Sequence, residues 1–160
     1  MTAHPVNGAA WIASAHPDPK SVEAQWQTHC LGTATVPAGV VFDVVRMPLP
    51  LGYAVVQTTF SVEPPALLAD RLSRRAYLFV PPGTAETWDL FPTAALGRGY
   101  WIAVPKPGAV AWIDDAVIWE TAPDAGGRMM DPDQLRTAVR RNTGHRGTVT
   151  RASHAEDTPR

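Results

Sequence analysis

Prolines and glycines divide this chain into short apolar runs, and this division constrains the fold more than any other feature of the sequence. Proline accounts for 16 of the 160 residues, about double its average share. Because proline fixes φ and removes a backbone donor, it ends strands and helices. It closes three runs of strand-forming residues, at Val40–Val45, Arg75–Val80 and Tyr100–Val104. None of the apolar runs approaches the roughly 20 residues of a membrane-spanning helix.

Helix signals separate these runs. Three segments begin at a capping residue: Ser21–Trp26, capped by Asp18 or Ser21; Thr84–Leu90; and Gln134–Arg141, preceded by Asp131 and Pro132. A fourth segment, Leu51–Phe60, has apolar residues three to four positions apart. A terminal hairpin is expected from Val110–Ile113 and Val117–Trp119. Strands alternating with helices indicate layers packed on one core. We therefore expect an α+β fold, a single layered domain with a central mixed or antiparallel sheet flanked by helices.

Length and composition predict one domain. At roughly 100–200 residues per domain, 160 residues suffice for a single domain. We expect this domain at 10–141, after a flexible N-terminus at 1–9. Residues 142–160 are expected to form a disordered tail, because they have almost no large apolar side chains. The net charge of −1 excludes a nucleic-acid binder held by overall charge alone. The single cysteine, Cys30, excludes an internal disulfide, and no secretion signal begins the sequence. These features predict a cytoplasmic protein that makes no use of a membrane.

The three strand-like runs are expected to meet in one core centred on the sheet. The residues predicted to form it are Val41, Val44, Leu78, Trp101 and Ile102.

Asp43 is the residue most in need of an explanation, because it lies within an apolar strand. Burying an unpaired carboxylate is costly, so such a residue is usually paired or functional. One hypothesis is a metal or phosphate site at the carboxyl end of the strand. The other is a structural ion pair with Arg74 or Arg75.

Other polar residues carry weaker signals. The five histidines, at positions 4, 16, 29, 145 and 154, do not have the spacing of metal ligands. Cys30 lacks an obvious base and is interpreted as a small buried residue. The Gly97-Arg98-Gly99 segment is interpreted as a turn that leads into the third strand. Arg136, Arg140 and Arg141 form either a solvated helix face or, with Arg146 and Arg151, a phosphate contact.

Four segments, in this order and spacing, resemble the bifunctional DNA primase/polymerase N-terminal domain of the archaeo-eukaryotic primases, and most of all its short actinobacterial members. Ser21–Trp26 is similar to the helix of that family that ends in Trp, and Thr35–Val45 to its Gly-led strand with Asp-x-Asp. Ser73–Phe79 is similar to its Gly-Arg-His-x-Tyr-Phe strand, and Gly97–Pro105 to its Gly-x-Gly-Tyr strand. The resemblance covers roughly residues 10–120 and implies a primase/polymerase-like fold.

The departures from that family bear on activity. Its second metal-binding Asp corresponds to Val45, its phosphate-binding His to Ala76, and its third catalytic Asp has no counterpart in Pro92–Leu96. Two-metal chemistry needs several carboxylates around cations about 4 Å apart. The resemblance therefore implies a catalytically inactive domain in which Asp43 is vestigial, with no catalytic residue, no bound metal and no cofactor. Magnesium would be needed only if catalysis survived.

Two functions are compatible with these observations. The first is a regulatory or interaction module whose candidate partners are a nucleotide, a nucleic acid or a protein. The second is a small enzyme of different chemistry on the same scaffold, since a fold does not determine a function. For the first, Asp43, Arg46, Arg75 and Tyr77 are predicted to line one hollow that receives an anionic ligand, because arginine can direct two donors at a phosphate. A structural Asp43–Arg ion pair is the alternative for these residues.

Overall fold

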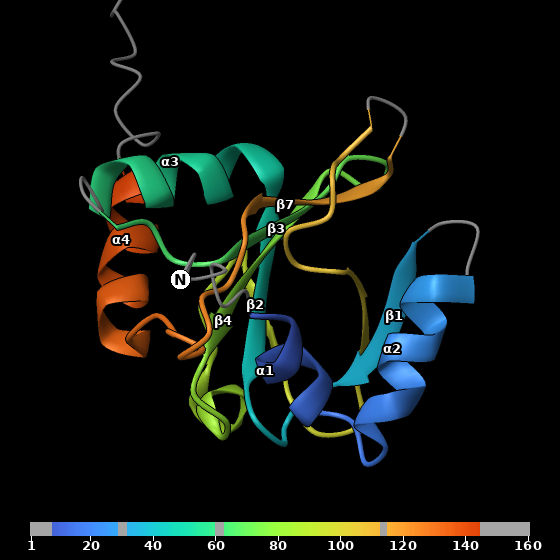
Figure 1. Cartoon of the computed structure of the whole chain (residues 1–160). Coiled ribbons are helices and arrows are strands. Elements are labelled where there is room, and N and C mark those ends of the chain that lie inside the picture. The colour runs from blue at the N-terminus through green and yellow to red at the C-terminus, as the bar shows by residue number, and fades with distance from the viewer. Residues whose placement is uncertain (1–7, 29–31, 60–62, 113–114, 145–160) are drawn as a thin grey trace, which may run out of the picture.

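The computed structural model describes residues 8–28, 32–59, 63–112 and 115–144 (Figure 1). In this part of the chain, a five-stranded antiparallel sheet and a two-stranded ribbon pack with four helices, which makes the chain an α+β domain, as predicted. The elements in chain order are α1 (Ala9–Ser14), α2 (Pro19–Thr28), β1 (Thr33–Pro37), β2 (Asp43–Pro48), α3 (Leu49–Thr59), β3 (Leu67–Asp70), β4 (Arg75–Val80), the 3₁₀ helix η1 (Thr84–Thr87), β5 (Ala94–Leu96), β6 (Trp101–Pro105), β7 (Val117–Thr121) and α4 (Pro132–Gly144).

The larger sheet has the strand order β5-β2-β4-β3-β7, and each neighbouring pair is antiparallel. The central strand β4 has the predicted bounds, and it pairs with β2 so that Val80 lies opposite Asp43 and Arg75 lies opposite Pro48. A tight turn joins β3 to β4, where Asp70 Oδ1 accepts a hydrogen bond of 3.0 Å from the Ser73 backbone N–H. This turn brings Asp70 opposite Arg75.

The two-stranded ribbon of β1 and β6 stands beside this sheet. Its inward residues are buried, whereas Trp101 on its outward side is 57% exposed. The predicted place of Trp101 in the core is therefore wrong, because the alternation of side chains along β6 turns it to the other side of the ribbon from Ile102. Helix α2 covers the inward side, and the Trp26 indole N–H donates to the Val104 carbonyl at 3.0 Å.

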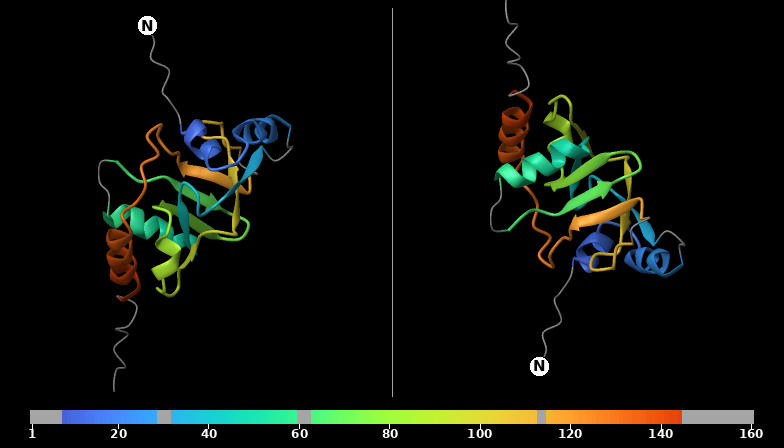
Figure 2. Two further views of the ribbon diagram at one scale, coloured as in Figure 1. Left: turned by 90° about the horizontal axis from the view of Figure 1, so that it is seen from below. Right: turned by 90° about the horizontal axis from the view of Figure 1, so that it is seen from above.

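The sheet separates two hydrophobic cores, where the sequence predicted one. Val44, Phe79 and Ile102 belong to the core that contains α1, α2 and the ribbon, and the half-buried Val41 packs against it. Leu78 belongs to the core on the other face, with residues of α3 and α4. Figure 2 shows α3 and α4 on one side of the strands and α1 and α2 on the other. The prediction failed because Val44 and Leu78 lie on opposite faces of paired strands.

The local signals in the sequence predicted α4 best among the helices. Asp131 caps α4 as predicted, since its Oδ1 accepts hydrogen bonds from the backbone N–H groups of Asp133 and Gln134 at 2.9 and 3.0 Å. This helix continues to Gly144, past the predicted end at Arg141. Helix α1 was not predicted, and η1 ends at Thr87 instead of Leu90. None of the helices in the described ranges is long and apolar enough to cross a membrane.

The predicted terminal hairpin is wrong. Among the described residues before the gap at 113–114, Val110 to Trp112 form no strand, and β7 pairs with β3 instead. Two contacts hold this arrangement: the Arg71 N–H donates to the Ala116 carbonyl at 2.7 Å, and the Trp119 indole N–H donates to the Pro105 carbonyl at 2.8 Å. The short strand β5, which the sequence did not indicate, occupies the opposite edge of the sheet.

Candidate functional site

Asp43 is the first residue of β2, so it lies at the amino end of its strand and not at the carboxyl end, where the sequence placed a site. The chain turns before it, where the Gly39 N–H donates to the Phe42 carbonyl at 2.8 Å. The carboxylate is 1% exposed. Its Oδ2 accepts a hydrogen bond of 2.8 Å from the Ala85 N–H, while its Oδ1 has no hydrogen-bond partner among the described residues.

The predicted ion pair of Asp43 with Arg74 or Arg75 does not form. Arg75 lies opposite Pro48, at the far end of β2 from Asp43. Arg74 precedes it in the turn, with a φ of 56°. Over the residues that the structure describes, Asp43 forms no salt bridge within 4.0 Å. The described part of the chain therefore provides no counter-ion for this carboxyl group.

The four residues predicted to share one hollow divide between the two faces of the sheet. Arg46 lies opposite Tyr77 across the β2–β4 pair, and Arg75 lies two residues from Tyr77 on the same side. Asp43 lies three residues from Arg46 and therefore on the opposite side. The structure brings Arg46, Arg75 and Tyr77 together and separates Asp43 from them, which corrects the prediction of a single hollow.

The face with Arg46, Tyr77 and Arg75 is rich in positive charge. Both guanidinium groups are exposed and form no ion pair with any described residue. Asp70, opposite Arg75, is the neighbouring acid, and its Oδ1 is already bonded to the Ser73 N–H. Burial raises the pKa of the Tyr77 phenol, Asp70 adds to this rise, and Arg46 and Arg75 oppose it. At neutral pH the phenol is protonated and can donate a hydrogen bond.

The other face of the sheet is tightly packed around Val45 and Ala76. Val45, two residues after Asp43 and on the same face, is fully buried. Ala76 is also fully buried, and a Cβ built on Gly52 of α3 would lie only 2.4 Å from the Ala76 Cβ. Helix α3 thus packs directly against this strand. A histidine in place of Ala76 would have no room beneath this helix.

A hollow of about 560 Å³ opens beside Asp43, between the turn before β2, the segment after β4 with η1, and β5 with the turn that follows it. Small residues form most of its wall, and the charged or aromatic groups lining it besides Asp43 are Glu86, Arg98 and Tyr100. Gly97 packs on the carboxylate: a Cβ built there would lie 3.5 Å from both carboxylate oxygens. Sequence reasoning identified Gly97 to Gly99 only as a turn, which is confirmed, and no signal in the sequence linked it to Asp43.

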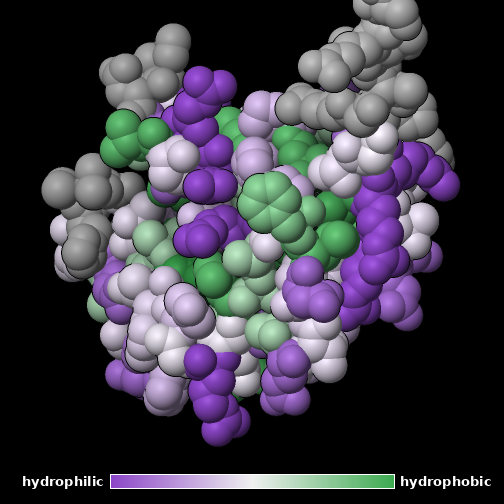
Figure 3. Space-filling view, turned by 180° about the vertical axis from the view of Figure 1, so that it is seen from behind, coloured by the Kyte–Doolittle hydropathy of each residue, from purple (hydrophilic) through white to green (hydrophobic). Residues whose placement is uncertain are grey.

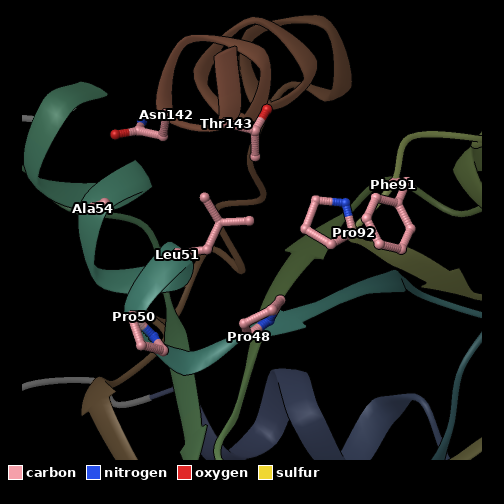
Figure 4. A pocket seen from close by; sticks show the side chains of 8 residues that line it. All are labelled: Pro48, Pro50, Leu51, Ala54, Phe91, Pro92, Asn142 and Thr143. Carbon is pink, nitrogen blue, oxygen red and sulfur yellow. The ribbon is translucent and has the colours of Figure 1, made fainter. Parts of the chain in front are cut away.

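A second cavity, of about 420 Å³, lies between α3, α4 and the Phe91–Pro92 turn (Figure 4). Its lining is apolar except for Asn142 and Thr143. The Asn142 amide already donates to Thr58 Oγ1 at 3.0 Å and to the Ala138 carbonyl at 2.9 Å. Figure 3 shows apolar side chains gathered in the middle of one face of the molecule, with hydrophilic ones around them. This cavity offers no titratable or nucleophilic group for chemistry.

The remaining sequence candidates add no chemical group to either face. Among the described residues, no three His, Cys, Asp or Glu side chains come together as a metal site would require. His16 accepts a hydrogen bond from the Asp18 N–H at 2.9 Å. Arg136 pairs with Asp133 at 2.8 Å and lies over the Trp88 ring, so it supports α4. The other four histidines, Cys30, Arg146 and Arg151 lie outside the described residues.

Comparison with known proteins yields no relative: no family model matches the chain, and neither the curated proteins nor the solved structures contain a significant match.

Proposed function

We propose that this chain is a catalytically inactive, primase/polymerase-like interaction module, and that the face formed by Arg46, Arg75 and Tyr77 receives an anionic ligand. The ligand class that we assign to this face is a nucleotide or an oligonucleotide, bound through its phosphates. The role is regulatory: the domain recognises the ligand and does not transform it. The resemblance of four sequence segments to the primase/polymerase family motivates the choice of ligand.

The observation that carries the proposal is the register of β2 and β4. It sets Arg46 opposite Tyr77 and places Arg75 diagonally from Arg46, at about 7–8 Å for such neighbours. Each guanidinium can direct two N–H donors at a phosphate or carboxylate. The Tyr77 phenol, which also has a side-chain hydrogen bond with Ser73, adds a third donor group on the same side of the sheet. Neither arginine is engaged by a carboxylate in the described ranges.

The absence of catalysis follows from the opposite face. A nucleotidyl-transfer site needs several carboxylates that converge on two metal ions. The position on the same face as Asp43 and two residues after it holds Val45, which is fully buried. A single carboxylate cannot organise two hard cations that take six or more oxygen ligands each.

The binding test is a double substitution with a matched control. Arg46→Ala with Arg75→Ala should abolish binding of a nucleoside triphosphate or a fluorescent oligonucleotide, measured by anisotropy at two salt concentrations, because phosphate contacts depend on salt. Arg140→Ala with Arg141→Ala removes the same charge from the exposed surface of α4 and should leave binding unchanged. Loss of binding in the control pair alone would place the anion site on α4 and contradict the proposal. Lack of binding by the wild type would favour a protein partner.

The activity test is primer extension with Mg²⁺ or Mn²⁺. We expect no incorporation of nucleotides by the wild-type chain. Template-dependent incorporation that disappears on Asp43→Ala would show that the domain is an enzyme and would overturn the assignment of a non-catalytic role.

A further inference from the structure

Asp43 has no part in the proposed anion face, yet it combines deep burial, an unpartnered oxygen and an adjoining hollow. We propose that this hollow is a separate binding site, and that it takes a small molecule carrying a protonated nitrogen with N–H donors, such as an ammonium or guanidinium group. The nitrogen donates to Asp43 Oδ1.

The buried Asp43 carboxylate lacks a counter-charge and one hydrogen bond. A carboxylate that is 1% exposed has lost most of its water, and such a group needs both a counter-charge and hydrogen bonds to offset the cost. The Ala85 N–H supplies one hydrogen bond, to Oδ2, at 2.8 Å. Oδ1 has no partner among the described residues. A cationic N–H group supplies the missing hydrogen bond and the missing charge together.

Asp43 lines the hollow, and a glycine packs on its carboxylate there. Gly97 contributes no side chain there, and a Cβ at this position would lie 3.5 Å from both carboxylate oxygens. Gly39, Gly83, Ala85 and Ala95 keep the rest of the wall small within about 560 Å³. Glu86, exposed at the rim, adds a second negative charge that favours a cation.

A nitrogen cation fits these donors better than a metal ion does. In the described part of the chain, no group of three His, Cys, Asp or Glu side chains surrounds the hollow. Divalent Mg²⁺ and Ca²⁺ take six or more oxygen ligands, whereas an ammonium group needs only acceptors within hydrogen-bond distance. Arg98 also lines the hollow, but it is exposed and forms no ion pair with Asp43. The described residues therefore supply no cation to this carboxylate.

The experiment titrates the full chain with ethylammonium chloride and with methylguanidinium chloride, followed by amide NMR. The reporter is the Ala85 amide, because its hydrogen is bonded to the same carboxylate. We expect a saturable shift of this resonance with both probes. Tetramethylammonium chloride, which has the charge but no N–H, should give none. An equal response to tetramethylammonium, or an Ala85 resonance that does not move with either probe, would overturn the proposal.

Variants locate the site. Asp43→Asn keeps an oxygen for the Ala85 N–H but removes the charge, and it should weaken binding of both probes roughly tenfold or more, the factor for losing one charge-assisted hydrogen bond. Asp89→Asn removes an exposed carboxylate outside the hollow and should change nothing. Unchanged affinity in Asp43→Asn would refute the site. If that variant does not fold, Glu86→Gln serves instead, because it removes the second negative charge that lines the hollow and should weaken binding of both probes; unchanged affinity in it would then count against the site.

Two further variants separate this site from its alternatives. A response to the probes that appears only after Arg98→Gln would mean that Arg98 already occupies the carboxylate in solution, which would overturn the proposal. The Arg46→Ala and Arg75→Ala pair should keep the full response, since both residues lie on the opposite face of the sheet. Loss of the response in this pair would contradict a separate site. Failure of the anion-binding test leaves this proposal unaffected, because the two tests use different ligands and residues.

Discussion

Substitution of Leu78 by alanine tests whether β4 lies at the centre of this domain. Leu78 is fully buried on the central strand β4. It lies opposite Val45 of β2 and opposite Leu67 of β3, and it belongs to the core beneath α3 and α4. Its removal therefore opens a cavity in the middle of the sheet and not at an edge.

The expected loss of unfolding free energy follows from how little the surroundings can relax. Replacement of a buried leucine by alanine costs about 2–5 kcal/mol, and the cost rises with the volume of the cavity that remains. Helix α3 cannot move closer to β4, because Gly52 is already in tight contact with Ala76. The strands on both sides of Leu78 are held by their hydrogen-bonded register. We therefore expect about 3–5 kcal/mol, a large part of the about 5–15 kcal/mol that stabilises a typical domain.

The assay is urea unfolding of the full chain, followed by circular dichroism, with the slope of the transition as a check that the unfolded state is unchanged. Leu72→Ala is the matched control, because the same chemical change is made at a leucine that is 85% exposed in the β3–β4 turn. It should stay within about 0.5 kcal/mol of the wild type. A loss below about 1 kcal/mol in Leu78→Ala, or a loss equal to that of the control, would refute the assignment of β4 to the centre of the domain.

Two further predictions concern a helix cap and a buried phenol. In urea unfolding, Asp131→Ala should lower the unfolding free energy by about 0.5–2 kcal/mol, because it removes the oxygen that accepts two hydrogen bonds at the start of α4. Asp131→Asn keeps an oxygen at this position and should lower it much less. Equal losses in both variants would contradict the role of the cap. Burial raises the pKa of Tyr77, so its contribution to stability is complete below the unfolded value of about 10 and is lost as the pH rises through the folded value. Tyr77→Phe should therefore reduce the stability that the domain loses at alkaline pH. In a titration followed by phenolate absorbance, the variant should have one fewer tyrosine that ionises at raised pH. A titration curve identical to that of the wild type would contradict the raised pKa of Tyr77.

Local signals in the sequence were sufficient to predict several elements. The run Arg75–Val80 was predicted with its observed bounds, because it is apolar and closed by prolines. The Asp131 cap and a helix over Ser21–Trp26, which lies within α2, were also predicted. Each of these features depends on residues that are close together in the chain, where capping and spacing act directly.

The candidate sites were only partly accessible from the sequence. An acid within an apolar run identified Asp43 as exceptional, and its burial without a counter-ion is the basis of the second site. The alternation of side chains indicated that Arg46 points away from Asp43, but the shared hollow was predicted nevertheless. A shared hollow would have needed a bend in the strand, whereas β2 pairs regularly with β4 from Asp43 to Pro48.

The sequence by itself determined several of the strands and helices and which side chains share one side of each strand, because these properties follow from periodicity and local caps. Only the tertiary structure decided which strands become neighbours. The pairing of β2 with β5 brings Gly97 and Arg98 to Asp43 across more than fifty residues of chain. Backbone hydrogen bonds along a strand edge are nearly the same for every sequence, so the choice of partner depends on how the two faces of the sheet are buried together. Alternation along β2 turned Arg46 away from Asp43, whereas the pairing of β2 with β4 put Arg75 and Tyr77 on the side of Arg46. The two proposed sites therefore lie on opposite faces of one sheet.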